Sequence, residues 1–226
     1  MRGFATAEGR DRKAAKIEAV LCAALDSDHL ADHDIVDVGS GSGHIAAHLA
    51  GSNRVTAADI EDQIQASAPQ LQFALLAGDR FPFDDGSFDI AVLNFVLMYV
   101  PDPLATPKET RRVLRPGGLC YVALPNRCFP IDPHVHLPFV SWLPAALYQP
   151  LVNRLRRTDE RVRLFTPADA RVLFEKAGFG YEDFTHRILH EPGRFHIGLP
   201  TQLPDWPWLT WLSPSNIFLL RVPNQP

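Results

Sequence analysis

The feature that most constrains this chain is a run of three alternating glycines between an apolar segment and a segment with helical spacing. Residues 35–38 are mostly β-branched, as in a buried strand, and apolar residues recur at helical spacing over 44–49. Between them lie Gly39, Gly41 and Gly43. Glycine tolerates a positive φ and has no Cβ, so a ligand can approach the backbone where the next helix exposes its first N–H groups. This segment predicts a strand, a tight ligand-binding loop and a helix.

Two kinds of cofactor fit such a loop. Gly41, Gly43 and Ala46 satisfy the relaxed GxGxxG/A pattern of dinucleotide-binding proteins. Asp37, however, stands two residues before Gly39 and gives the pattern DxGxGxG. A carboxylate at that strand end would repel a pyrophosphate and suits the ammonium of an amino-acid moiety better. An NAD(P)-dependent oxidoreductase stays open as an alternative, although the chain shows no Tyr-x-x-x-Lys pair.

A second acidic residue follows the next predicted strand, residues 54–59. Asp59 lies 20 residues after Gly39, and an acid there is placed to accept hydrogen bonds from both hydroxyls of a ribose. The alternative is that Asp59 caps a helix that begins at Glu61. The two roles can coexist.

Strand and helix patterns alternate along the chain, which predicts an α/β fold with a parallel sheet. An amphipathic helix over 14–25 precedes the glycine loop, and any helix in the short connection over 61–71 has about two turns because Pro69 interrupts it. Further strands are expected at 71–77, 90–93, 119–124, 181–188 and 216–222, with helices at 107–114 and 166–177. Thr166 and Pro167 give the start signal of the last helix.

Composition narrows the class of protein. With 226 residues, of which 46% are hydrophobic, the chain is most simply one domain over 1–226. A net charge of −4 provides no general attraction to nucleic acid. Cys22, Cys120 and Cys128 show neither CxxC spacing nor an even number, so we expect no metal site, no disulfide framework and a cytoplasmic protein. No export signal or bilayer-spanning run is recognisable.

Four motifs in order resemble class I S-adenosylmethionine-dependent methyltransferases. They are DVGSGSG at 37–43, the acid Asp59, GDRFPFDDGSFDIAVLN at 78–94 and RRVLRPGG at 111–118. Within that superfamily the chain most resembles the branch of quinone-biosynthesis and small-molecule methyltransferases. The resemblance implies a doubly wound, Rossmann-like sheet of seven strands whose last strand is antiparallel to its neighbours. It also implies methyl transfer from S-adenosylmethionine to a small-molecule or lipid-like acceptor, with a cofactor-binding regulatory protein without turnover as a further alternative.

The resemblance also assigns cofactor-binding residues. Asp37 and the glycine backbone at 39, 41 and 43 would hold the methionine moiety, and Asp59 would hold the ribose. Asp79 would bind the adenine amino group, and Phe81 would flank the adenine ring. Asn94 would present its backbone near the sulfonium, and the neighbouring residues Ile60 and Arg80 complete the set. Tyr99 stands where this branch often has a histidine.

Two segments exceed what the core fold needs: a first insertion over 126–163 and a second insertion over 190–214. Long insertions at the carboxyl end of a strand are usually lids, so we expect both to lie over the active site. Asp132, His134 and His136 alternate in the first insertion and would share one face of an extended segment. His134 and His136 are the candidates for a general base, and a packing role is the alternative.

The first insertion also combines apolar and basic residues. Its apolar stretch includes Leu137, Phe139, Val140, Trp142, Leu143, Ala146, Leu147, Leu151 and Val152, and its arginines are Arg154, Arg156, Arg157, Arg161 and Arg163. Such a pairing is typical of a segment at a membrane surface. Prolines at 138, 144 and 150 argue against one long helix and favour short turns packed over the pocket. The three tryptophans at 206, 208 and 211 of the second insertion favour local packing or a lid wall.

Overall fold

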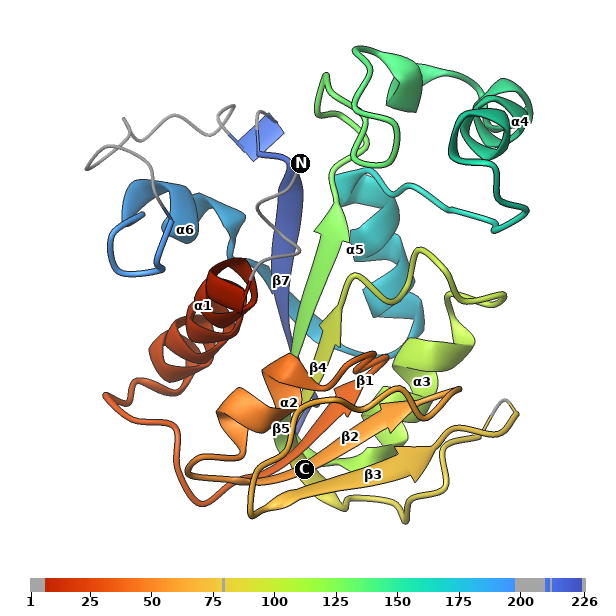
Figure 1. Cartoon of the computed structure of the whole chain (residues 1–226). Coiled ribbons are helices and arrows are strands. Elements are labelled where there is room, and N and C mark those ends of the chain that lie inside the picture. Colours follow the sequence, from red (N-terminus) through yellow and green to blue (C-terminus); the bar gives the residue numbers. More distant parts are fainter. Residues whose placement is uncertain (1–6, 79, 198–209, 212, 225–226) are drawn as a thin grey trace.

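The computed structural model describes residues 7–78, 80–197, 210–211 and 213–224. A twisted central sheet carries helices on both faces (Figure 1). One face is covered by α1 (Ala7–Leu25), α2 (His44–Leu49) and α6 (Thr185–His190), and the other by α3 (Ala105–Val113) and α5 (Pro167–Lys176). The first insertion adds a 3₁₀ turn, η1 (Val140–Trp142), and α4 (Ala145–Arg156).

The sheet has seven strands in the order β3-β2-β1-β4-β5-β7-β6. The strands are β1 (Asp34–Val38), β2 (Arg54–Asp59), β3 (Leu71–Leu75), β4 (Phe88–Asn94), β5 (Leu114–Pro125), β6 (Gly180–Asp183) and β7 (Ser215–Arg221). β1 to β5 run parallel, and β7 lies antiparallel between β5 and β6. The doubly wound α/β fold with an antiparallel last strand is therefore confirmed. The strand order reverses between β1 and β4, which is where open α/β sheets bind ligands.

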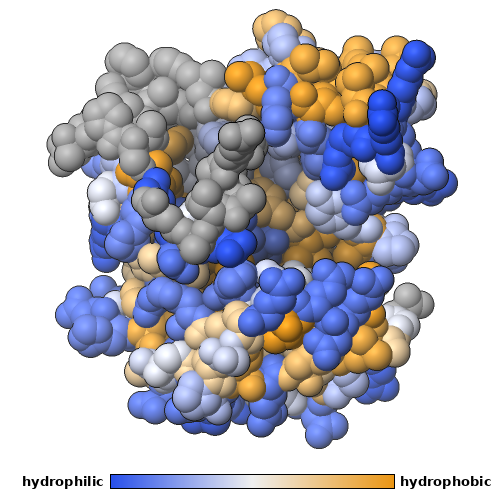
Figure 2. All heavy atoms as spheres, viewed as in Figure 1, coloured by the Kyte–Doolittle hydropathy of each residue, from blue (hydrophilic) through white to orange (hydrophobic). Residues whose placement is uncertain are grey.

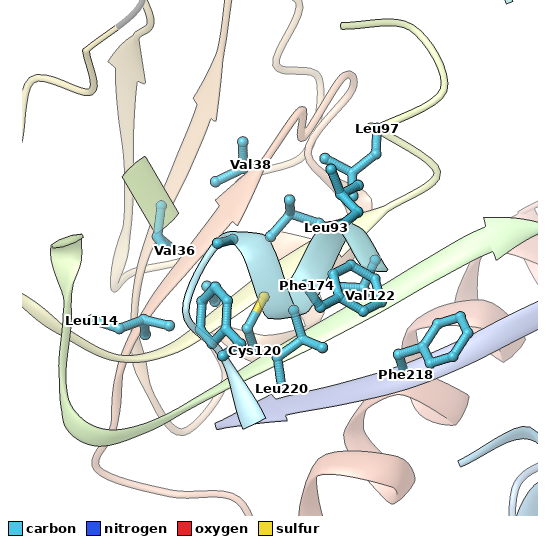
Figure 3. Close-up of a cluster of buried hydrophobic side chains, with 14 of the residues drawn as sticks. Val36, Val38, Leu93, Leu97, Leu114, Cys120, Val122, Phe174, Phe218 and Leu220 are labelled. Carbon is cyan, nitrogen blue, oxygen red and sulfur yellow. The ribbon is translucent and has the colours of Figure 1, made fainter. Parts of the chain in front are cut away.

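Both faces of the central strands are buried, as the apolar runs of the sequence predict. On one side β1, β4, β5 and β7 pack against α5, and Figure 3 shows Val36, Leu93, Phe174 and Phe218 among the side chains of this core. Phe174 is fully buried, and its ring lies 5.2 Å from that of Phe218. The opposite face packs against α1, α2 and α6. The sheet thus holds the carboxyl ends of β1, β2 and β4 rigidly side by side.

Local signals predicted some element ends correctly and others wrongly. α5 begins at Pro167, and its N-cap Thr166 forms a reciprocal capping box with Asp169. The expected strand over 181–188 is wrong beyond residue 183. Asp183 accepts a hydrogen bond from the Thr185 N–H at 3.1 Å, which turns the chain into α6. The connection over 62–68, where any helix was expected to be short, contains no helix.

The first insertion follows β5 and extends beyond the carboxyl end of that strand (Figure 1). The prolines do not prevent α4, which accommodates Pro150 in its interior. Tyr148 and Val152 of this helix are buried against Val140, and this packing outweighs the lost backbone hydrogen bond. Within the described ranges no helix is both long and apolar enough to cross a membrane.

Candidate functional site

The glycine loop joins β1 to α2 at the reversal point of the sheet. Gly39, Gly41 and Gly43 have φ values of 68°, 52° and 78°. A Cβ added at Gly39 would lie 2.6 Å from Val96, and one added at Gly43 would lie 2.7 Å from Ile64. A Cβ added at Gly41 would meet open space. Conformation and close packing together require glycine at 39 and 43, and the middle glycine leaves the loop surface bare.

The amide groups of these glycines are already engaged within the protein. Gly39 donates to the Ala58 carbonyl at 2.7 Å, Gly43 donates to the Ser40 carbonyl at 3.0 Å, and Gly41 donates to the Asp59 carboxylate at 2.7 Å. Anion binding through these three N–H groups is therefore not the use of this loop. An ammonium group donates hydrogen bonds, and it would be received by backbone carbonyls and carboxylates instead.

Asp37 supplies a carboxylate beneath the loop. Its side chain is 1% exposed, and its Oδ2 has no hydrogen-bond partner among the described residues. Burial, and secondarily the Asp59 carboxylate, raise the pKa of Asp37 to about 7, although the Ala46 amide opposes this. A buried carboxylate without a counter-charge is the group that a bound cation would stabilise. The environment of Asp37 thus fits an amino-acid ammonium.

Asp59 ends β2 beside the loop. One carboxylate oxygen accepts from Gly41 at 2.7 Å and the other from its own neighbour Ile60, also at 2.7 Å. A carboxylate offers about four acceptor positions, so two remain for hydroxyl groups. Glu61 begins no helix, which removes the competing capping role. The geometry keeps Asp59 available to a ribose.

The remaining residues that were expected to bind the cofactor differ in how exposed they are. Ile60 is 74% exposed next to Asp59, and Asn94 ends β4 in a half-buried position. Arg80 is exposed, and its guanidinium lies 4.0 Å from Asp85. Phe81 is buried in the core, with its ring packed edge-on against Phe83. Asp79 lies outside the described residues.

Two residues near the loop, Ile64 and Val96, were missed by the sequence analysis. Ile64 and Val96 pack against Gly43 and Gly39, and Phe95 has a φ of 62° directly after β4. A left-handed φ in an aromatic residue is costly and concentrates at functional sites. Ile64 and Val96 are distant in the chain from the glycines that they contact, so nothing in the local pattern could have identified them.

Two cavities lie between the segment after β4 and the first insertion. The larger has a volume of about 490 Å³ and the smaller about 280 Å³, and Met98 and Tyr99 line both. The larger is closed mainly by Leu143, Tyr148 and residues 161–164. Figure 2 shows a hollow below the apolar cap where Figure 1 places α4. The volume of the larger cavity is that of a small-molecule pocket.

The alternating trio of the first insertion does not share one face, so that expectation was wrong. Asp132 is fully buried, and its carboxylate accepts from the amides of His134 and Val135 and from the Ser141 hydroxyl, at 2.8 to 2.9 Å. This hydrogen bonding fixes a turn instead of an extended segment. His136 is exposed with a φ of 58° and lines neither cavity.

His134 points to the smaller cavity. Its Nδ1 lies 3.2 Å from the Tyr148 hydroxyl, and Tyr99 packs edge-on against its ring. Burial lowers the pKa of His134 more than the nearby Asp132 raises it, so the imidazole is neutral at pH 7. In the described part of the chain no group of three His, Cys, Asp or Glu side chains could hold a metal ion.

Asn126 and Arg127 anchor the insertions at the end of β5. The buried Asn126 amide donates to the carbonyls of residues 210, 211 and 213 at 3.0 to 3.3 Å. Arg127 donates to the carbonyls of Ser141 and Leu143 at 3.2 Å. Trp211 is 63% exposed, whereas the expectations for Trp206 and Trp208 lie outside the described residues.

Comparison with known proteins matches residues 36–122 to a family described as "Methyltransferase domain". The demethylmenaquinone methyltransferase of Chlorobaculum tepidum is 34% identical over 97 residues, which cover 40% of each chain. The chain thus spans about two fifths of the length of this curated relative.

Solved structures extend the likeness to the whole chain. An S-adenosylmethionine-dependent methyltransferase from Mesorhizobium loti superposes with a TM-score of 0.61 at 14% identity, covering 96% of this chain and 98% of that one. The [4+2]-cyclase SpnF superposes with a TM-score of 0.56 at 18% identity, covering 96% and 82%. The fold alone therefore does not define a reaction. Residues 36–122 thus match a methyltransferase domain, the chain has the fold of S-adenosylmethionine-dependent methyltransferases, and it resembles those of quinone biosynthesis.

Proposed function

We propose that the protein transfers a methyl group from S-adenosylmethionine to a small-molecule acceptor. The observation that carries the proposal is the uncompensated, buried Asp37 beneath a bare glycine loop, with Asp59 beside it. The segment after β4 connects this place to the cavities, because Val96 contacts Gly39 while Phe95 and Met98 line the smaller cavity. Cofactor and acceptor would thus meet at the end of β4.

The residues present fit the cofactor. Asp37 would hold the ammonium, Asp59 the ribose hydroxyls, and the exposed Ile60 one side of the adenine. When bound, S-adenosylmethionine supplies a methyl group activated by a sulfonium. The chain's own contribution is then to bind the acceptor, orient it and exclude water, which accounts for much of the rate in such transfers.

For an acceptor that must lose a proton, we assign the general base to His134. The imidazole is neutral because burial depresses its pKa, and its ring borders the smaller cavity. The Tyr148 hydroxyl at 3.2 Å from Nδ1 would orient the ring. His136 lines neither cavity, which favours His134 of the two candidates.

The first insertion would act as a lid that contacts a membrane surface, with the second insertion beside it. Phe139 and Trp142 are each 55% exposed with their rings 4.8 Å apart, and Leu147 is 60% exposed. Exposed aromatic and aliphatic side chains near arginines suit the lipid interface. Flotation with anionic vesicles at low salt tests the membrane half: protein that stays in the soluble fraction contradicts it. The three free cysteines support a cytoplasmic location.

Calorimetry with S-adenosylhomocysteine and NAD(H), followed by transfer of labelled methyl groups to a cell extract, tests the function as a whole. We expect binding of S-adenosylhomocysteine, no binding of NAD(H), and a labelled product. Binding of NAD(H) instead would favour the oxidoreductase. Binding of S-adenosylhomocysteine without any labelled product would favour the regulatory protein.

A further inference from the structure

The walls of the larger cavity combine apolar side chains with a concentration of positive charge. Apolar contacts come from Met98, Val100, Leu143 and Leu164, among others. Arg127, Arg161 and Arg163 also line the cavity, and its described lining contains no acidic residue. Six arginines and three acidic residues give the segment 126–164 a charge of +3, although the whole chain carries −4.

Two of these arginines, Arg161 and Arg163, are exposed side chains on a fixed stretch of backbone, and neither has a counter-ion among the described residues. Arg161 and Arg163 flank Val162, whose side chain is buried. The backbone is fixed on both sides, because Val162 donates to the Gln149 side chain at 3.0 Å and Arg163 donates to the Met98 carbonyl at 2.8 Å. Within the described ranges neither guanidinium has an acidic side chain within 4.0 Å, whereas Arg156 pairs with Glu160 at 3.4 Å.

We infer that the acceptor is an amphipathic anion, with an apolar body in the larger cavity and a carboxylate or phosphate group held by Arg161 and Arg163. Guanidinium groups match the planar oxygens of carboxylate and phosphate and bind them through paired N–H groups. The apolar side chains of the cavity favour an amphipathic anion over a purely polar one, and the two arginines without a counter-ion favour an anion over a neutral isoprenoid. This inference rests on the proposed function, because it names the acceptor of that same reaction.

Calorimetry with three probes of equal chain length tests the inference on the full chain: decyl phosphate, decanoate and decanol. We expect at least one of the anions to bind about tenfold more tightly than decanol, with an affinity that falls as salt increases. The double variant R161Q/R163Q should lose about tenfold in anion affinity and leave decanol binding unchanged. The matched control is R154Q/R157Q, which removes the same charge from arginines of the same insertion that line neither cavity.

Three outcomes would overturn the inference. Decanol could bind as tightly as both anions, or the control variant could lose as much anion affinity as R161Q/R163Q. In the third outcome, R161Q/R163Q would lose binding to anionic vesicles but would still bind the monomeric probes normally. That result would assign these arginines to a membrane surface. Each variant is also titrated with S-adenosylhomocysteine. If that ligand does not bind the wild type, the methyltransferase proposal fails, and the anion result is judged separately.

Discussion

The glycine loop and the first insertion are built on opposite principles. The loop is made almost entirely of backbone: three left-handed glycines, engaged amides and two carboxylates at strand ends. The first insertion is made of side chains, with Asp132 organising its turn, Arg127 holding its two parts and Val152 anchoring its helix. In the function proposed above, the loop would hold a cofactor common to many enzymes, whereas the first insertion would face an acceptor particular to this one.

This difference explains which region can be recognised in sequence. A backbone conformation that only glycine adopts leaves a short, fixed pattern. A cavity bounded by residues 98–101, 127, 141, 143, 145, 148, 149 and 161–164 leaves no such pattern, because its walls can be rebuilt with other side chains. Variants of the two regions should therefore fail in different ways.

The largest effect is expected for Gly39→Ala. A side chain there adopts a φ of 68° and collides with Val96 at 2.6 Å, so the free energy of unfolding should fall by about 2 to 5 kcal/mol. Gly41→Ala is the matched control, because it shares the positive φ but meets no atom within 4 Å. It should cost about 1 kcal/mol. Equal losses in urea denaturation would show that the contact with Val96 is not what requires glycine.

Asp37→Asn should stabilise the cofactor-free protein in a pH-dependent way. The pKa of Asp37 is raised to about 7 in the folded state, from about 4 in the unfolded state. The favourable contribution of Asp37 to the free energy of unfolding is therefore fully present below pH 4. That contribution is lost as the pH rises toward 7. The variant should gain about 2 to 4 kcal/mol over the wild type at pH 8 and almost nothing near pH 4.

The same substitution should weaken S-adenosylhomocysteine more than adenosine, because only the former brings an ammonium to Asp37. Calorimetry with both ligands, alongside denaturation at several pH values, checks the two halves of this prediction. A pH-independent stability difference would mean that Asp37 titrates normally. Equal losses for both ligands would mean that the residue acts through the fold.

Asp59→Ala should weaken S-adenosylhomocysteine binding by about 1 to 3 kcal/mol, because the ribose loses a charged acceptor. Asp62→Ala is the control, since it removes the same charge from an exposed position three residues later. Calorimetry on folded variants gives both values. Unchanged affinity in Asp59→Ala would mean that this carboxylate serves only its hydrogen bonds with the Gly41 and Ile60 amides.

The smallest effect on stability is expected in the insertion. Replacing Phe139 and Trp142 by alanine should change the free energy of unfolding by about 0.5 kcal/mol or less at each position, because both side chains are exposed. Cofactor affinity should be unchanged, whereas turnover of an identified acceptor should fall. Normal turnover would contradict the lid, and lost cofactor affinity would show that the two regions are not separable.

Much of the fold could be predicted from local signals. The capping box at Thr166, the glycine loop and the acid that ends β2 each lie within a few residues of the structure they specify. The turn and helix over residues 184–190 could not be predicted, because their sequence has a good strand pattern. A side-chain hydrogen bond of Asp183 turns the chain there instead. In the site, Ile64 and Val96 were missed because their role is to pack against glycines more than 20 residues away in the chain.

Asn126 has a consequence for recombining this protein with its relatives. One side-chain amide holds the chain after residue 209 to the base of the first insertion, through carbonyls at 210, 211 and 213. A crossover placed within either insertion would leave that amide facing carbonyls of foreign spacing, or leave those carbonyls without a donor. The two insertions are therefore tied to each other by this one side chain, and we expect that they must be exchanged together for the amide and its three carbonyls to stay paired.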